Sequence, residues 1–230
     1  MALWIKICGI TCVEDVEAAI AAGADALGIN LIPSSKRAVD FETLRTLSLA
    51  AGERVELVAV VTGEQKDAFE RMLEASPRAT LQFHGEEPPE LVAALLPRAF
   101  KAVGVASPAD VALASRYPGD RLLVDAKVSG ASGGTGTSFD WTLVQELARE
   151  RNLIVAGGLR PENVAGAVTA LAPFGVDVAS GVESSDPRRK DPDKMRRFVD
   201  AARGAAARLD SAGGVDYEPR AGQALRESKP

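Results

Sequence analysis

The feature that most constrains the fold is a short apolar run followed by a segment of helical periodicity, repeated eight times between about residues 3 and 205. Apolar runs bounded by turn residues are typical of strands buried on both faces of a parallel sheet. The predicted strands comprise residues 3–8, 25–30, 56–61, 79–83, 100–105, 122–124, 152–156 and 176–178.

Each predicted strand is followed by apolar residues at helical spacing. The first helix is expected to begin at a capping box formed by Thr11 to Glu14, and the last at Asp191, with Pro192 in its first turn. The other helices are expected around residues 41–49, over 65–75, from 88–89, over 108–115, after 140 and from 161.

Eight strand–helix units in so short a chain predict a single (β/α)8 TIM barrel, because an open doubly wound sheet seldom shows so even a repeat. The barrel is expected to span residues 1–207 as one catalytic domain. Residues 208–230 are expected to form a flexible C-terminal tail, since from Asp210 onward the chain has little apolar content.

Charge and composition limit the binding partners and the cellular compartment that can be expected. The formal net charge of −5 gives no global basic field for nucleic acid or an anionic membrane surface. No apolar run reaches membrane-spanning length, and the N-terminus does not read as a signal peptide. We therefore expect a cytoplasmic protein, in which Cys8 and Cys12 are both thiols.

Candidate site residues lie where the predicted strands end. In a (β/α)8 barrel the reacting residues lie at the carboxyl ends of the strands and in the loops that follow them. The residues at these positions are Cys8, Arg37, His84, Asp125, Gly157, Gly158, Ser180 and Gly181.

Glycines suggest two different uses within this set. Gly157-Gly158 and Ser180-Gly181 follow the last two strands, where such barrels often bind phosphate through backbone N–H groups, so we expect a phosphorylated small molecule as ligand. The glycine-rich stretch 129–138 after Asp125 matches no nucleotide-binding spacing and is expected to cover the site as a flap. The alternative is that Asp125 caps a turn and the glycines form a linker.

Each candidate side chain also has a structural alternative. Cys8 either packs as a small apolar residue or acts as a base, if positive charge lowers its pKa; Lys6, two residues earlier on the same strand face, is a source of such charge. His84 is either a structural hydrogen-bonding residue or a binding residue. Arg37 is either a solvated surface charge or a ligand-binding group.

Five motifs, in this order along the chain, resemble the phosphoribosylanthranilate isomerase family of tryptophan biosynthesis. They are Lys6–Thr11, Leu81–Gly85, Leu123–Asp125 with Gly133–Gly136, Ala156–Leu159 and Val176–Glu183.

The resemblance implies an Amadori rearrangement of N-(5-phosphoribosyl)anthranilate without metal or cofactor. It implies that Asp125 is the general acid and Cys8 the general base, and that Arg37 faces the anthranilate carboxylate. His84, Gly134 and Asp177 are expected to bind substrate. No nucleic-acid or membrane partner is expected from the charge and the apolar pattern, and the protein is expected to be a monomer or a homodimer.

The sequence departs from the usual family pattern at Lys36, Phe83 and Ala179, which adjoin the expected anthranilate and phosphate contacts. Two other functions remain open. One is a different phosphosugar isomerase or epimerase on the same barrel, and the other is a phospho-ligand-binding barrel without catalysis.

Overall fold

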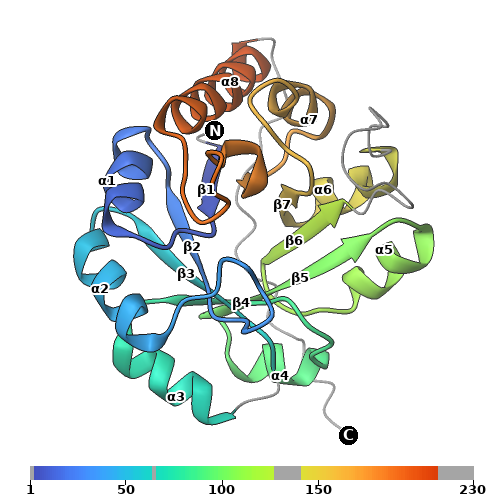
Figure 1. Cartoon of the computed structure of the whole chain (residues 1–230). Helices are drawn as coiled ribbons and strands as arrows, with labels where there is room; N and C mark the ends of the chain where they lie inside the picture. The colour runs from blue at the N-terminus through green and yellow to red at the C-terminus, as the bar shows by residue number, and fades with distance from the viewer. Residues whose placement is uncertain (1–2, 64–65, 127–140, 212–230) are drawn as a thin grey trace, which may run out of the picture.

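Eight parallel strands close into a barrel in the computed structural model, which describes residues 3–63, 66–126 and 141–211. Each strand pairs with its neighbours in chain order, and β8 closes the ring against β1 (Figure 1). The strands are β1 (Trp4–Cys8), β2 (Ala26–Asn30), β3 (Glu56–Val61), β4 (Thr80–Phe83), β5 (Ala99–Val105), β6 (Arg121–Ala126), β7 (Asn152–Ala156) and β8 (Gly175–Val178). The predicted (β/α)8 barrel is confirmed.

Helices follow the strands and form the outer ring seen in Figure 1. They are α1 (Val13–Ala21), α2 (Phe41–Ala51), α3 (Lys66–Ala75), α4 (Pro89–Ala94), α5 (Pro108–Ser115), α6 (Gln145–Glu150), α7 (Val164–Leu171) and α8 (Pro192–Ser211), with 3-10 helices η1 (Trp141–Val144) and η2 (Ser180–Val182).

Strand alternation divides the buried residues into an outer and an inner set. Residues facing the helices form the larger apolar core, and residues facing the axis form a smaller cluster that includes Trp4, Phe100 and Leu123. Below this cluster Glu56 accepts hydrogen bonds from Trp4 Nε1 at 3.2 Å and Arg121 Nη1 at 2.7 Å, among others. These contacts close the amino end of the barrel. The opposite end, where the strands finish, is called the barrel mouth.

Two local predictions about helices were wrong. The capping box at Thr11 does not form, because α1 has Cys12 as its N-cap without a side-chain cap, and Thr11 Oγ1 donates to the carbonyl of Arg188 instead. The helix around residues 41–49 was expected from its apolar residues, but one of them, Leu49, is 76% exposed.

The start of the last helix agrees with the prediction, but its end lies beyond the expected boundary. Asp191 caps α8, since its Oδ1 accepts from the backbone N–H groups of Asp193 and Lys194 at 2.9 and 3.0 Å. The helix continues to Ser211, past the boundary expected at residue 207. The rest of the expected tail, 212–230, lies outside the described residues.

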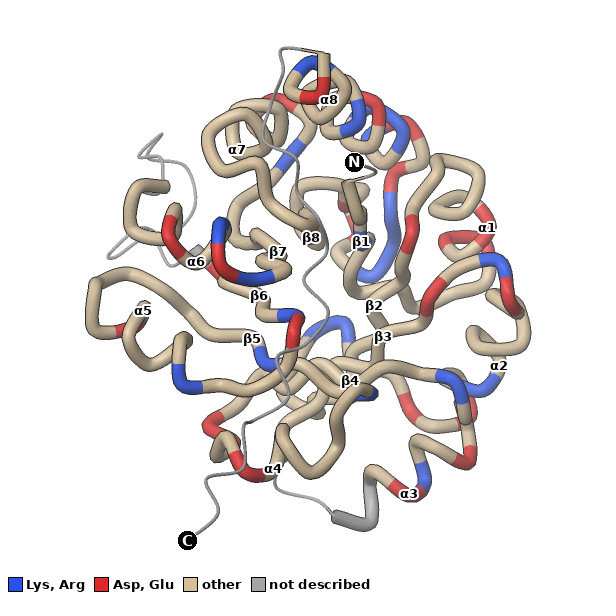
Figure 2. Tube along the Cα trace, turned by 180° about the vertical axis from the view of Figure 1, so that it is seen from behind, with Lys and Arg blue, Asp and Glu red and all other residues tan. Residues whose placement is uncertain are grey.

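Charged residues of both signs lie on the outer helices α2, α3 and α8, as Figure 2 shows, whereas α1 carries acidic residues only. No helix in the described part of the chain has the length and apolar content needed to cross a membrane. The predicted site residues are expected at the barrel mouth.

Candidate active site

Cys8 ends β1 at the carboxyl end of the barrel and is partly buried. The next residue, Gly9, has φ = +80°, which turns the chain away from the strand and which few side chains tolerate. Cys8 lies opposite Gly28 on β2. A Cβ at Gly28 would lie 2.6 Å from Cys8 Sγ and 2.9 Å from Lys6 Cε. The missing side chain at Gly28 therefore makes room for both groups.

Lys6 lies on the barrel axis below Cys8, with no exposed surface. Its Nζ donates to Gln82 Oε1 at 2.8 Å and lies 2.9 Å from Asp177 Oδ1. The Lys6–Asp177 contact is an ion pair, in which Asp177 Oδ1 receives no hydrogen bond from the described residues. A buried charge needs such partners, and Asp177 and Gln82 supply them.

The pKa of Lys6 is set by opposing effects. Burial alone would lower it, but the carboxylate of Asp177 and the negative charge that Cys8 carries as a thiolate outweigh burial and raise it. The raised pKa favours the ammonium form of Lys6 beside the Cys8 sulfur.

Burial raises the pKa of the Cys8 thiol above its ordinary value, although Lys6 and Lys190 act in the opposite direction. The lowered pKa considered from the sequence is therefore absent in the free protein. Positive charge nonetheless lies close to the site, because Lys6 pairs with Asp177 and both Lys190 and Arg37 contact Glu183. Lys6 and Lys190 would stabilise a thiolate at Cys8.

Asp125 lies near the end of β6, in register with Gly104 on β5 and Ala156 on β7. It follows Leu123 of the inner apolar cluster by two residues, so it shares that inward face. Asp125 is only partly buried. Asp125 and Cys8 are thus both at the barrel mouth, on strands that are separated in the ring by β7 and β8.

His84 follows β4, and its backbone N–H extends the ladder by donating to the carbonyl of Val61 at 2.9 Å. It lies two residues beyond the inward-facing Gln82 and is exposed. Arg37, in the loop between β2 and α2, reaches the mouth and binds Glu183 through Nε. Both residues therefore lie at the predicted end of the barrel.

The two loops expected to bind phosphate touch each other. Gly157 and Gly158 have φ of +91° and +62°, and within the described residues no acceptor takes the N–H of Gly158. A Cβ at Gly181 would lie 2.0 Å from the carbonyl oxygen of Leu159, so the loop after β8 packs directly on the backbone of the loop after β7. Gly134 and the glycine-rich stretch after Asp125 lie outside the described residues.

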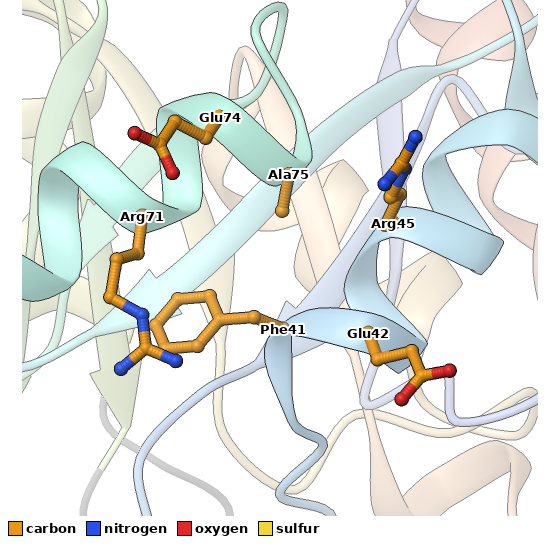
Figure 3. Close-up of a pocket in the computed structure, with 6 residues that line it drawn as sticks. All are labelled: Phe41, Glu42, Arg45, Arg71, Glu74 and Ala75. Carbon is orange, nitrogen blue, oxygen red and sulfur yellow. The ribbon is translucent and has the colours of Figure 1, made fainter.

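A pocket on the outer surface is remote from this mouth. It lies between α2 and α3 and is lined by Phe41, Glu42, Arg45, Arg71, Glu74 and Ala75 (Figure 3). The Arg71 guanidinium stacks over the Phe41 ring at 4.5 Å, and none of the predicted site residues lies there. In the described ranges, no cluster of three or more His, Cys, Asp and Glu residues is arranged to hold a metal ion.

Known proteins match both the sequence and this geometry. A sequence model described as N-(5'phosphoribosyl)anthranilate (PRA) isomerase matches residues 5–201. The chain belongs to this isomerase family. The family member from Magnetococcus marinus is 43% identical over 209 residues, covering 89% of this chain and 97% of that protein.

Solved structures of the family agree with the fold. The phosphoribosyl anthranilate isomerase of Thermotoga maritima has a TM-score of 0.80 and 37% identity, covering 88% of this chain and all of that one. A family structure in complex with reduced 1-(o-carboxyphenylamino)-1-deoxyribulose 5-phosphate has a TM-score of 0.77 and 34% identity over the same shares. The residues matched by the family's sequence model, 5–201, overlap all eight strands.

Some contacts of this isomerase site were not anticipated from the sequence. Gln82 as a partner of Lys6 had a usable signal, because it alternates with His84 on the same strand face. No sequence signal pointed to Lys190 or to the role of Glu183, because both depend on how the loop between β8 and α8 folds back over the barrel mouth. In that loop Lys190 has its side chain fully buried and donates to the carbonyl of Ala179 at 3.0 Å.

The raised pKa of Cys8 predicts the pH dependence of its alkylation. The test uses a variant in which serine replaces Cys12, because Cys12 is a second thiol whose pKa is also raised, to about 11. In this variant the rate at which iodoacetamide alkylates Cys8 should still rise beyond pH 9.0, the ordinary pKa of a thiol. The thiolate fraction rises with pH up to the folded pKa, and that pKa lies higher than normal. Lys6→Met should move the midpoint further up. A plateau reached below about pH 8 would contradict the burial effect.

Gly181→Ala should disturb both loops after β7 and β8, because the new Cβ meets backbone at Leu159 and Arg160 rather than a movable side chain. We expect a loss of unfolding free energy of about 1–3 kcal/mol and a raised KM for a phosphorylated substrate. Gly166→Ala in α7, where a Cβ meets nothing within 4 Å, is the matched control and should stabilise slightly. Equal behaviour of the two variants in urea melts and kinetics would refute the predicted loop contact.

Proposed function

We propose that this chain catalyses the Amadori rearrangement of N-(5-phosphoribosyl)anthranilate to 1-(2-carboxyphenylamino)-1-deoxyribulose 5-phosphate, a step of tryptophan biosynthesis. The observation that carries the proposal is a thiol and a carboxyl group, Cys8 and Asp125, at one barrel mouth of a chain with this family's sequence over residues 5–201. The reaction needs one general base and one general acid.

The rearrangement is proposed to begin at Asp125. Its carboxyl proton passes to the furanose ring oxygen, the bond from that oxygen to C1 breaks, and the nitrogen lone pair forms a C1=N Schiff base. For this step Asp125 must hold a proton near neutral pH. The negative charges of the substrate act in that direction.

Cys8 is proposed to complete the reaction as the base. Its thiolate removes the proton from C2, and the electron pair forms the C1=C2 bond of an enolamine as the iminium nitrogen is neutralised. The enolamine then takes a proton at C1 and loses one from the C2 hydroxyl group, which gives the ketone. The Lys6 ammonium group beside the sulfur stabilises the thiolate. No electron acceptor is consumed, and the proposal requires no metal or cofactor.

Substrate binding is assigned to the remaining residues of the mouth. Arg37 is proposed to bind the anthranilate carboxylate, and His84, Asp177 and Gly134 to contact the rest of the substrate. The phosphate is assigned to Gly157, Gly158, Ser180 and Gly181, whose backbone N–H groups suit an anion. The contact between the loops after β7 and β8 supports this assignment.

The proposal extends to the domain organisation, the location and the oligomeric state of the protein. We propose one catalytic barrel domain followed by a C-terminal tail, a cytoplasmic location, and a monomer or homodimer. Two free cysteines support a reducing compartment. One Thermotoga maritima structure is described as mutually generated monomers of a dimeric isomerase, so both oligomeric states occur among structures similar to this chain.

The fluorescence of freshly prepared phosphoribosylanthranilate tests the function directly. Purified protein should abolish this fluorescence with saturation kinetics, and the product should be the deoxyribulose phosphate by mass and by chromatography. Turnover of simple pentose phosphates without turnover of this substrate would favour another phosphosugar isomerase. Stoichiometric binding without turnover at micromolar protein would favour a binding protein.

A further inference from the structure

Glu183 is a buried carboxylate that joins two loops at the barrel mouth. It follows η2, its side chain is 9% exposed, and Oε1 binds Nε of Arg37 from the loop between β2 and α2. Lys190 Nζ lies 3.7 Å from the same oxygen. The carboxylate therefore faces two cations at once.

The backbone around Glu183 is firmly held. Glu183 and Lys190 form an antiparallel bridge, and Lys194 Nζ donates to the Glu183 carbonyl at 2.7 Å. Arg188 of the same loop donates to the carbonyls of Lys36 and Ala38 at 3.1 and 3.2 Å. One loop thus holds both the side chain of Arg37 and the backbone on either side of it.

The stem of Arg37 crosses Gly9, next to Cys8. A Cβ at Gly9 would lie 2.3 Å from Arg37 Cδ, so the arginine passes where only a glycine leaves room. This path brings the guanidinium group close to the residue assigned as the base. The arginine is 19% exposed at its side chain, so it is neither solvated freely nor fully enclosed.

The contact with Glu183 uses only one edge of the guanidinium group. Because Nε is engaged, Nη1 and Nη2 remain, and within the described residues neither has a partner. A pair of N–H donors held in a plane is the arrangement that binds a carboxylate through two parallel hydrogen bonds. The free edge therefore matches the carboxylate of an anthranilate group.

We propose that Glu183 is a positioning residue that holds Arg37 through Nε and so directs its Nη edge at the substrate carboxylate. Glu183 thereby sets the preference for a 2-carboxyphenyl amine over an unsubstituted phenyl amine. This inference rests on the proposed function, and in particular on Arg37 as the carboxylate-binding residue. The competing explanation is that the Arg37–Glu183 pair only ties two loops together.

A comparison of two substrates separates these explanations. N-(5-phosphoribosyl)anthranilate and N-(5-phosphoribosyl)aniline differ only in the carboxylate, so their ratio of kcat/KM measures its recognition. We expect Arg37→Ala to reduce this ratio strongly. Glu183→Gln should reduce it about tenfold, mainly through KM for the carboxylated substrate, while kcat/KM for the aniline substrate changes little. Glu183→Asp, which keeps the charge on a shorter side chain, should retain part of the ratio.

The double variant decides whether Glu183 acts through Arg37. In the Arg37→Ala background, Glu183→Gln should cause no further fall in the ratio, because the group it positions is gone. Equal losses on both substrates, or a further fall in the double variant, would overturn the proposal. The Arg37–Glu183 pair would then only tie the two loops together. Glu162→Gln is the control, since Glu162 is an exposed acid paired with Arg197 at 3.4 Å. If the unchanged protein turns over neither substrate, the proposed function itself has failed.

Discussion

Cys8→Ser and Asp125→Asn are each expected to lower kcat for phosphoribosylanthranilate by about 10²–10⁴-fold. Serine keeps the shape of cysteine, but a hydroxyl group gives up its proton far less readily than a thiol, so the base for C2 is lost. Asparagine is isosteric with aspartic acid and has no acidic proton for the ring oxygen. KM should change much less than kcat, because both groups act mainly in the transition state.

Matched controls separate chemistry from folding in this experiment. Cys12→Ser changes the other thiol, which lies at the N-cap of α1, and Asp120→Asn changes an exposed acid before β6. Both should keep normal turnover, and all four variants should unfold at nearly the same urea concentration. Turnover close to that of the unchanged protein in either Cys8→Ser or Asp125→Asn would remove that residue from the mechanism.

Lys101→Met is expected to lower the free energy of unfolding by about 3–5 kcal/mol, because it leaves the carboxylate of Glu87 buried without its cation. Lys101 Nζ lies 3.2 Å from Glu87 Oε2, and the two side chains are 3% and 1% exposed. Lys101 Nζ also donates to the carbonyl of Gly85 at 2.7 Å. Burial lowers the pKa of Lys101, and Glu87 partly offsets this effect.

The same pair holds the loop that carries His84. Glu87 Oε1 accepts from the N–H groups of Gly63 at 2.7 Å and Gly85 at 3.1 Å, which ties the loop after β3 to the loop after β4. A Cβ at Gly63 would lie 2.4 Å from Glu87 Cγ, so the side chain fills the space beside that glycine. Loss of Lys101 should therefore disturb the barrel mouth as well as lower stability.

Urea denaturation of three variants tests this prediction. Arg54→Met is the control, because the Arg54–Glu17 pair is about half exposed and screened by solvent, so its loss should change stability little. Adding Glu87→Gln to Lys101→Met removes the unpaired charge and should restore part of the lost stability. A loss below about 1 kcal/mol in Lys101→Met would show that the buried pair is not needed for folding.

Strand positions were predictable because a parallel barrel demands short apolar runs at regular spacing. β3, α5 and β7 occupy the residues expected from periodicity alone. Polar contacts were predictable only where both partners lie within a few residues of each other in the sequence. Asp191 caps α8 as expected, whereas Thr11 turns from its own helix to the distant carbonyl of Arg188.

The sequence alone determined the architecture, the family and which side chains reach the barrel mouth. Alternation along each strand decides which face a residue takes, so Lys6, Cys8 and Asp125 were assignable without coordinates. Tertiary structure decided how those residues are paired and charged. Lys6 with Asp177, Arg37 with Glu183 and Glu87 with Lys101 meet only when the barrel closes and its loops fold over the rim. It also decided the direction of the Cys8 pKa, because burial depends on every neighbour and the sequence names only the nearest ones.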